Sequence, residues 1–252
     1  MRVVVFIPAR LGSHRLPNKI IKTMFGLPMV EHVIRRAKYS KMFAKIILVS
    51  NNKLIKKYIK SKNIKIVFSK KKHLNGTSRV SEVSKNFKYN LAIILFGDEP
   101  FIDPKKLKLI VSKIKTKIND KYDLINVVTN IQSSDFKSRS VVKCVINKKG
   151  YIIDYFRINK KIPLNYKVFK SSGIFVFKKN ILENYKKLNL SKKEKSTNIE
   201  QFRFLDNKLK IKSLFVDGIN PSINTMKEFN DAVNFVKNNK NELSLIKKLK
   251  RL

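Results

Sequence analysis

The stretch Val3–Lys19, VVVFIPARLGSHRLPNK, indicates how this chain is built. It opens with a continuous run of apolar and mostly β-branched residues, which is typical of a strand buried on both faces of a sheet. Pro8 is expected to end this strand, because proline has no N–H to donate to a neighbouring strand. The polar loop that follows contains three cations, Arg10, Arg15 and Lys19.

This loop is a candidate phosphate-binding site. Open α/β sheets bind their ligands at the carboxyl edge of the strands, and backbone N–H groups near Gly12 would add to the positive charge there. Two of the three cations are arginines, whereas lysine dominates elsewhere, and this favours phosphate recognition. A solvated basic loop remains the alternative in so lysine-rich a protein.

The composition indicates one globular α/β domain over residues 1–252. The chain is 43% apolar, and no linker, repeat or low-complexity segment divides it. Cys144 is the only cysteine, which excludes an internal disulfide and fits a reducing cytoplasm. We expect Cys144 to be a buried strand residue rather than a nucleophile. We also expect a cytoplasmic protein, without a signal peptide or membrane insertion, because no apolar run approaches the ~20 residues of a membrane span.

The net charge of +40 is unusual for such a domain. A basic excess of this size often indicates binding to nucleic acid or to an anionic membrane surface. Here the lysines are spread from end to end among many Asn and Ile residues, which indicates a bias toward AT-rich codons rather than one binding patch. We therefore expect no nucleic-acid partner.

Short apolar runs alternate with longer amphipathic segments, the pattern of a sheet covered by helices. Strands are expected at 3–7, 45–50, 64–68, 91–96, 124–129, 141–146, 151–156, 172–177 and 211–216. Helices are expected at 29–40, 52–60, 78–86, 103–117, 198–205 and 225–238, followed by a basic amphipathic tail at 241–252. Lys148–Gly150 resembles a hairpin turn, so antiparallel pairing is expected near residues 140–180.

Two further stretches carry side chains suited to chemistry. Asp98 and Glu99 follow the most apolar strand, and a carboxylate at the edge of a basic site favours a Mg²⁺ ion held between Asp98 and phosphate. For Glu99, a charge at a helix entrance is an equally good interpretation. In the stretch Asn75–Arg79, Gly76 would let a nucleotide approach the backbone at a helix start, while capping by Thr77 or Ser78 is the simpler alternative.

Other catalytic constellations are missing from the sequence. It contains no G-x-x-x-x-G-K-[ST] loop, no metal-ligand spacing among its histidines and no evident Ser-His-Asp arrangement. Cations, one or two carboxylates and a metal ion are sufficient for nucleotidyl transfer, which depends mainly on positioning and charge stabilisation.

These motifs resemble those of the 3-deoxy-manno-octulosonate cytidylyltransferases, also called CMP-Kdo synthetases. The resemblance begins with IPARLGSHRLPNK and the following GLPMVEHV, and it continues in order along the chain. HLNGTSR is similar to the family's HQSGTER, FGDEP to QGDEP, and IEQFR to LEQLR. A Val-Lys step at Val142–Lys143 and an aromatic-rich segment ending at Arg157 also match the family pattern.

Two departures from this pattern stand out. The family has a histidine shortly before the glycine that matches Gly173, where this chain has Lys170-Ser171-Ser172. The family also has an aspartate, its second Mg²⁺ ligand, where this chain has Asn224.

The resemblance implies a Rossmann-like nucleotide-diphospho-sugar transferase fold, with a mixed, mostly parallel sheet flanked by helices. It also implies a homodimer that transfers CMP from CTP to Kdo for lipopolysaccharide biosynthesis. Carried over by position, Asp98 and Asn224 would hold Mg²⁺, and the sugar acid would contact Arg157, Glu200 and Gln201. The catalytic residues implied are Arg10, Arg15, Lys19 and Asp98. The nucleotide-binding residues implied are Pro8, Ala9, Arg10, Gly12, Ser13, Arg15, Lys19, Asn75, Gly76 and Arg79.

Three alternatives stay open at this point. The acceptor could be another acidic sugar, such as an amino-Kdo or a nonulosonic acid. The chain could be a non-catalytic relative, given Asn224, or a nucleic-acid-binding module that depends on its charge.

Overall fold

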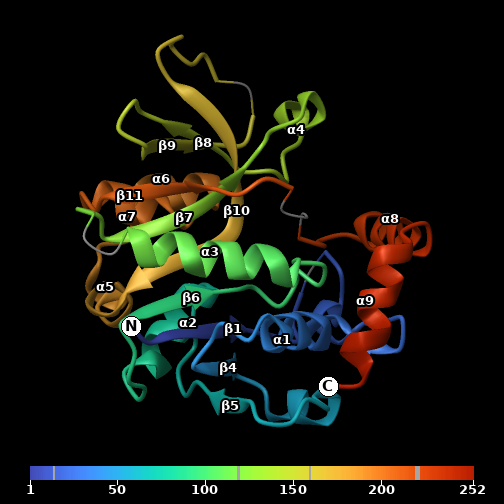
Figure 1. Ribbon diagram of the computed structural model, residues 1–252. Helices are drawn as coiled ribbons and strands as arrows, with labels where there is room; N and C mark the ends of the chain where they lie inside the picture. Colours follow the sequence, from blue (N-terminus) through green and yellow to red (C-terminus); the bar gives the residue numbers. More distant parts are fainter. Residues whose placement is uncertain (14, 118–119, 159, 219–221) are drawn as a thin grey trace.

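The computed structural model describes residues 1–13, 15–117, 120–158, 160–218 and 222–252. Its centre is a nine-stranded mixed sheet with the strand order β5-β4-β1-β6-β10-β7-β11-β9-β8. Helices cover both faces of this sheet, and the N-terminal strand β1 lies well inside it (Figure 1). The expected α/β fold class, a mixed sheet flanked by helices, is confirmed.

The expected strands and helices occur in the anticipated order, and the structure adds short elements that were not expected. The strands of the large sheet are β1 (Val3–Pro8), β4 (Lys45–Ser50), β5 (Lys65–Phe68), β6 (Leu91–Ile94), β7 (Leu124–Thr129), β8 (Lys143–Ile146), β9 (Tyr151–Phe156), β10 (Lys167–Lys178) and β11 (Ile211–Phe215). The short strands β2 (Thr23–Met24) and β3 (Leu27–Pro28) form a separate hairpin. The α-helices are α1 (Met29–Ser40), α2 (Gly76–Ser84), α3 (Pro104–Thr116), α4 (Ser133–Lys137), α5 (Lys179–Glu183), α6 (Lys192–Thr197), α7 (Phe202–Asp206), α8 (Met226–Lys237) and α9 (Lys240–Lys250). Short 3₁₀ helices are η1 (Lys19–Ile21), η2 (Lys53–Tyr58) and η3 (Tyr185–Lys187).

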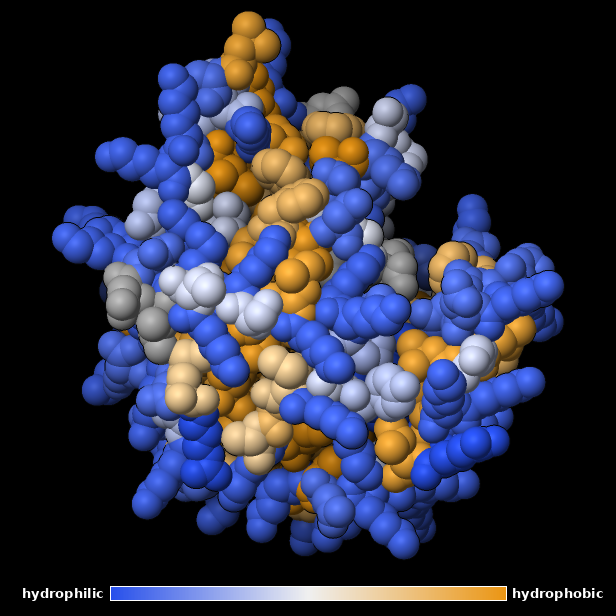
Figure 2. Space-filling view, viewed as in Figure 1, coloured by the Kyte–Doolittle hydropathy of each residue, from blue (hydrophilic) through white to orange (hydrophobic). Residues whose placement is uncertain are grey.

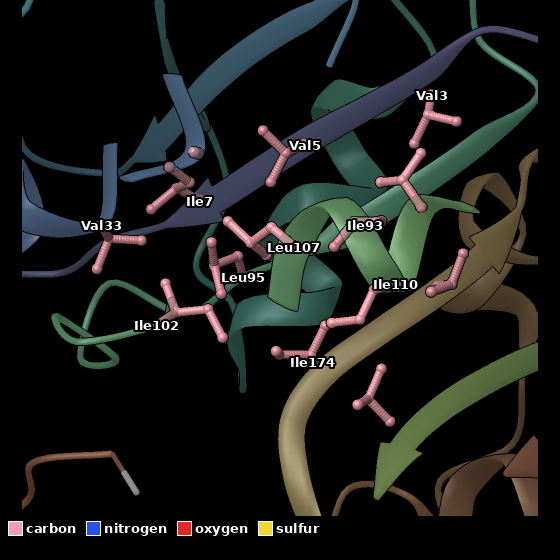
Figure 3. Packing of buried hydrophobic residues seen from close by; sticks show 14 of the residues in the cluster. Val3, Val5, Ile7, Val33, Ile93, Leu95, Ile102, Leu107, Ile110 and Ile174 are labelled. Carbon is pink, nitrogen blue, oxygen red and sulfur yellow. The ribbon is translucent and has the colours of Figure 1, made fainter. Parts of the chain in front are cut away.

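Alternate residues of β1 pack into two different cores, as the period of a strand requires. Val3, Val5 and Ile7 join the cluster beneath α1 and α3, which includes Leu107 and Ile110 (Figure 3). Val4 and Phe6 join the cluster on the opposite face, beneath α2, α5 and α7. All five of these β1 side chains are buried, which explains the continuous apolar run.

Strand β10 joins the two halves of the sheet and runs antiparallel to both of its central neighbours, β6 and β7. Its first part also pairs with β8, so the antiparallel region expected near residues 140–180 is confirmed. The pairing with β7 shifts register between Ser171 and Phe175. At this bulge the buried amide of Asn126 donates to the carbonyl oxygens of Ser172 and Ile174 at 3.1 and 3.4 Å.

Three local expectations need correction. The segment at 52–60 forms a 3₁₀ helix, in which the side chain of Asn52 accepts from Leu54 N at 2.9 Å. The helix expected at 78–86 begins at Gly76, because Asn75 and Ser78 form a reciprocal capping box. The helix expected at 198–205 is interrupted, since Asn198 adopts a left-handed conformation that ends α6 before α7 begins.

The last helix, α9, is tied to α1 by a largely buried charge pair. Arg36 of α1 is completely buried and donates to Glu242 of α9 at 2.6 Å. Its guanidinium also lies 5.4 Å from the ring centre of Phe101. Beyond this pair, apolar residues of α8 and α9 pack with Leu16 and Met24, so the C-terminal helices support the phosphate loop and the β2–β3 hairpin.

Two smaller expectations concern Cys144 and the membrane. The thiol of Cys144 is buried on β8, as expected, and burial raises its pKa above the ordinary value for cysteine. Within the described residues, no helix combines the length and the apolar character that crossing a bilayer requires.

We predict that Glu242→Ala lowers the free energy of unfolding by about 3 kcal/mol, because it leaves the charge of Arg36 buried without its partner. Urea denaturation measures this change, with Asp231→Ala on the exposed side of α8 as the matched control. Equal stability of the two variants would show that the pair does not anchor α9.

Candidate active site

Lys19 is at the centre of the polar contacts made by the first loop. Its ammonium donates to Oδ2 of Asp98 at 2.6 Å and to Oδ1 of Asn224 at 3.1 Å. Arg15 donates to the same amide oxygen of Asn224 at 3.2 Å. Residues from three distant parts of the sequence therefore meet at one point, as the sequence predicted for the first loop and for Asp98.

The backbone explains why Asn224 reaches this point. Asp98 lies in the loop after β6, and its carbonyl oxygen accepts from Ile223 N at 2.9 Å. Asn224 then precedes α8, whose first turn is closed by the capping box of Thr225 and Glu228. The Glu228 carboxylate also accepts from Asn224 N at 2.6 Å, so the backbone at Asn224 is held on both sides.

The oxygens of Asp98 and Asn224 already converge on a cation, the Lys19 ammonium. One carboxylate and one amide oxygen, beside cationic side chains that suit phosphate, match the ligands that Mg²⁺ takes in nucleotide sites. The residues present thus fit a divalent ion bound together with a phosphate. Among the described residues, no group of three or more His, Cys, Asp or Glu side chains is arranged to hold a metal by itself.

The loop at Asn75 and Gly76 is packed tightly against the ends of two strands. A Cβ atom on Gly76 would lie 2.7 Å from Cε1 of Phe96 and 3.1 Å from Cγ of Pro8. Only glycine fits there. The sequence predicted that a nucleotide would approach the backbone at Gly76, but on the side of its missing Cβ the neighbours are protein side chains. The Asn75 side chain caps α2 and also donates from Nδ2 to the Tyr185 hydroxyl at 2.8 Å.

Glu99 is a buried carboxyl group and not a charge at a helix entrance. It is 4% exposed and lies against Gly173 in the bulge of β10, where any larger residue would overlap its carboxylate. Burial, assisted by the neighbouring charge of Asp98, raises the pKa of Glu99 to about 8. The alternative interpretation of Glu99 from the sequence was therefore wrong.

Arg79 and Glu200 lie on the α2 side of the site. Burial and the nearby charge of Arg10 lower the pKa of Arg79 below its ordinary value. The Glu200 carboxylate accepts from the Thr77 hydroxyl at 2.9 Å, and burial raises the pKa of Glu200 to about 7. Gln201 follows it and is buried at the start of α7.

Arg157 makes contacts that differ from the prediction. Its guanidinium donates four hydrogen bonds to backbone carbonyl oxygens, at 3.1 to 3.3 Å. The acceptors are the carbonyls of Thr197, Arg139, Ser140 and Asn198. A guanidinium has five N–H groups, so little of Arg157 is left for a direct contact with a sugar carboxylate. Burial and the nearby charge of Arg15 lower the pKa of Arg157 below its ordinary value.

The remaining predicted residues of the first loop lie beside this cluster. Ala9 is buried, and its N–H donates to Val49 O at 2.8 Å. Arg10 and Gly12 are exposed, Ser13 is partly exposed, and no atom lies within 4 Å of the position of a Cβ on Gly12. This leaves room for a ligand above the loop. His14, part of the same motif, lies outside the described residues.

The comparison with known protein families agrees with this arrangement. The sequence model described as "Cytidylyltransferase" matches residues 4–211, which include the first loop, the Asp98 loop and the α2 start. The chain belongs to the cytidylyltransferase family. Members of this family are nucleotidyltransferases, and the curated relatives of the chain carry a more specific name.

Several curated relatives of this cytidylyltransferase align over almost their whole length. A protein of Elusimicrobium minutum is 30% identical over 244 residues, covering 94% of this chain and 98% of the relative. An Escherichia coli protein is 26% identical over 227 residues, covering 89% of this chain and 92% of the relative. Both carry the name 3-deoxy-manno-octulosonate cytidylyltransferase.

Solved structures show the same fold. A CMP:2-keto-3-deoxy-manno-octonic acid synthetase complexed with CTP superposes with a TM-score of 0.85 at 24% identity, covering 94% of this chain and 99% of that one. An inositol-1-phosphate CTP transferase from T. maritima superposes with a TM-score of 0.66 at 15% identity, covering 94% of this chain and 97% of that one. This agreement confirms the Rossmann-like nucleotidyltransferase fold predicted from the motifs.

Some residues of this cytidylyltransferase site were missed by reasoning from the sequence. Tyr185 contacts the predicted residue Asn75, yet its position carries no recognisable signal. Thr77, which contacts Glu200, lies in the HLNGTSR motif but was considered only as a helix cap. Asn126 was detectable, because it is a polar residue inside an otherwise apolar strand. Buried polar groups in such strands need specific partners and often mark a functional region.

Proposed function

We propose that the protein is a 3-deoxy-manno-octulosonate cytidylyltransferase, which transfers CMP from CTP to Kdo and releases pyrophosphate. The observation that carries this proposal is the convergence of Arg15, Lys19, Asp98 and Asn224 at the sheet edge, in a chain of the cytidylyltransferase family. The name of the full-length relatives supplies the acceptor. The product would serve lipopolysaccharide biosynthesis.

In this reaction the anomeric hydroxyl of Kdo attacks the α-phosphorus of CTP. A new oxygen–phosphorus bond forms, the bond between the α-phosphorus and the bridging oxygen breaks, and pyrophosphate and a proton are released. Negative charge builds on the phosphate oxygens during this displacement. Arg10, Arg15 and Lys19 would bind the triphosphate and stabilise that charge, since guanidinium and ammonium groups form strong hydrogen bonds with phosphate.

Asp98 and Asn224 would hold Mg²⁺, and the bound ion would neutralise part of the negative charge of the phosphates. With the ion and nucleotide bound, the ammonium of Lys19 would donate to phosphate instead of to Asp98. On the nucleotide side, Asn75, Gly76 and Arg79 would surround CTP beside Ala9. On the acceptor side, Glu200 and Gln201 would contact the sugar.

A second acceptor is favoured by one observation. In the segment that departs from the family pattern, Ser171 and Ser172 donate their hydroxyls to Asn126 Oδ1 and Val127 O, at 2.7 Å each. Lys170 likewise pairs with Asp135 at 2.9 Å. This segment would present the acceptor with different groups from those of the family, so another acidic sugar, an amino-Kdo or a nonulosonic acid, is the alternative substrate.

A pyrophosphate-release assay tests the function. CTP, UTP, ATP and GTP are each combined with Kdo, an amino-Kdo and a nonulosonic acid. We expect turnover with CTP and Kdo. Turnover with CTP and a different acid would correct the acceptor, and no pyrophosphate from any pair would contradict the proposed function.

We predict that Asp98→Asn lowers turnover by ~100-fold, the effect of removing one strong electrostatic stabiliser from a reaction centre. The amide keeps the size of the side chain, so a loss would reflect its charge. Excess EDTA should abolish the wild-type rate. Undiminished turnover in EDTA would exclude a divalent ion from the reaction.

The variant Asn224→Asp tests the metal-binding role of Asn224. We expect a lower Mg²⁺ concentration at half-maximal rate, because a carboxylate binds this hard cation more strongly than an amide oxygen does. Titration of the rate with Mg²⁺ at saturating CTP gives this concentration. The same or a higher Mg²⁺ requirement would show that Asn224 is not a ligand.

We also propose a homodimer that forms through the β8–β10 region. Large apolar side chains are exposed in this part of the chain, and Leu164, between β9 and β10, is fully exposed. Figure 2 shows apolar side chains among hydrophilic ones over the same region. We predict that the protein sediments as a dimer and that Leu164→Asp shifts it toward the monomer, because a buried unpaired carboxylate opposes association. A monomeric wild-type protein would contradict this.

A further inference from the structure

Lys143 is a completely buried lysine, and no carboxylate among the described residues forms an ion pair with it. Its three ammonium N–H groups donate to the carbonyl oxygens of Ser138 at 2.8 Å, of Val141 at 3.1 Å and of Arg157. These contacts use all the donors of an ammonium group. Lys143 is therefore fully hydrogen-bonded, although burial lowers its pKa below the ordinary value.

Lys143 and Arg157 together enclose one short loop. Arg157 donates to the carbonyl oxygens of Arg139 and Ser140, both at 3.1 Å, so each of the four consecutive carbonyls at 138–141 accepts from one of these two cations. Arg157 also reaches the end of α6 through its bonds to Thr197 and Asn198. The two side chains thus fix the loop, the end of β9 and the end of α6 relative to one another.

Carbonyl groups solvate a cation without cancelling its charge. The carboxylate of Asp135 pairs directly with Lys170 at 2.9 Å and acts on Lys143 only through its more distant charge. The positive charges of Lys143 and Arg157 therefore persist, and the charge of Arg157 interacts with that of Arg15 in the phosphate loop. Burying a cation is costly, and a pair of cations held this way creates a positive potential that favours an anion nearby.

We propose that Lys143 is a positioning residue for the carboxylate of the acceptor sugar: it holds loop 138–141 and the backbone of Arg157 in place, and its charge adds to the potential that attracts the acid. This inference rests on the proposed function. It assigns to Lys143 part of the selectivity for an acidic sugar. The reason is that most N–H groups of Arg157 already donate to backbone carbonyls of the protein.

The test compares Lys143→Met with the wild type on two acceptors, the sugar acid and its neutral carboxamide. We expect the KM for the acid to rise about tenfold, equivalent to ~1.4 kcal/mol. The KM values for the carboxamide and for CTP should change by less than about twofold, since neither depends on the acceptor's charge. Lys143→Arg keeps a cation and should recover affinity for the acid.

Lys148→Met is the matched control, because it removes the same charge from an exposed position near the end of β8. It should leave all three KM values unchanged. If Lys143→Met does not fold, Lys143→Gln removes the charge while its amide can still donate to two carbonyls.

Two outcomes would contradict different proposals. An equal rise in KM for the acid and the carboxamide would reduce Lys143 to a structural role and overturn the inference alone. Absence of wild-type turnover with every sugar acid would overturn the proposed function and, with it, this inference.

Discussion

The arrangement of the site depends on the tight fit of one loop, Phe96–Glu99, between two glycines. The ring of Phe96 occupies the space that a side chain on Gly76 would need, and Glu99 does the same at Gly173. The contact of Phe96 with Gly76 holds the start of α2 against the loop that follows β6. The contact of Glu99 with Gly173 holds the bulge of β10 against the same loop. Asp98 lies between the two anchored residues, so its carboxylate is presented to Lys19 from a rigid loop.

Much of this could be predicted from local sequence, because the relevant forces act locally. The strand formed by the apolar run of β1 and the helix expected at 103–117 both formed as expected. The central place of β10 could not be predicted, since strand order depends on long-range packing. The contacts of Arg157 could not be predicted for a similar reason: its partners are backbone carbonyls from two distant segments, and carbonyls leave no mark in a sequence.

The charge composition of the chain explains how its buried cations are stabilised. Lysine and arginine number 57 against 17 acidic residues, so carboxylates cannot pair with every cation. Carboxylates are found where helices must be joined, as in the pairs Arg36–Glu242 and Arg203–Glu194. Around Lys143 and Arg157 the backbone takes this role. A cation paired with a carboxylate forms a unit with no net charge. A cation that is hydrogen-bonded only to carbonyl groups keeps its positive charge, which can attract an anionic ligand.

The central position of β10 has a consequence for how the chain folds. Strand β7 is flanked by β10 and β11, and β10 alone links it to β6. While the chain is being synthesised, β7 therefore has no hydrogen-bonding partner in the sheet until the residues of β10 from Lys170 onward have emerged. Pairing between segments this far apart is slow, and unpaired apolar strands are prone to aggregate. The β7 segment would thus be the part of the nascent chain that most needs protection by chaperones.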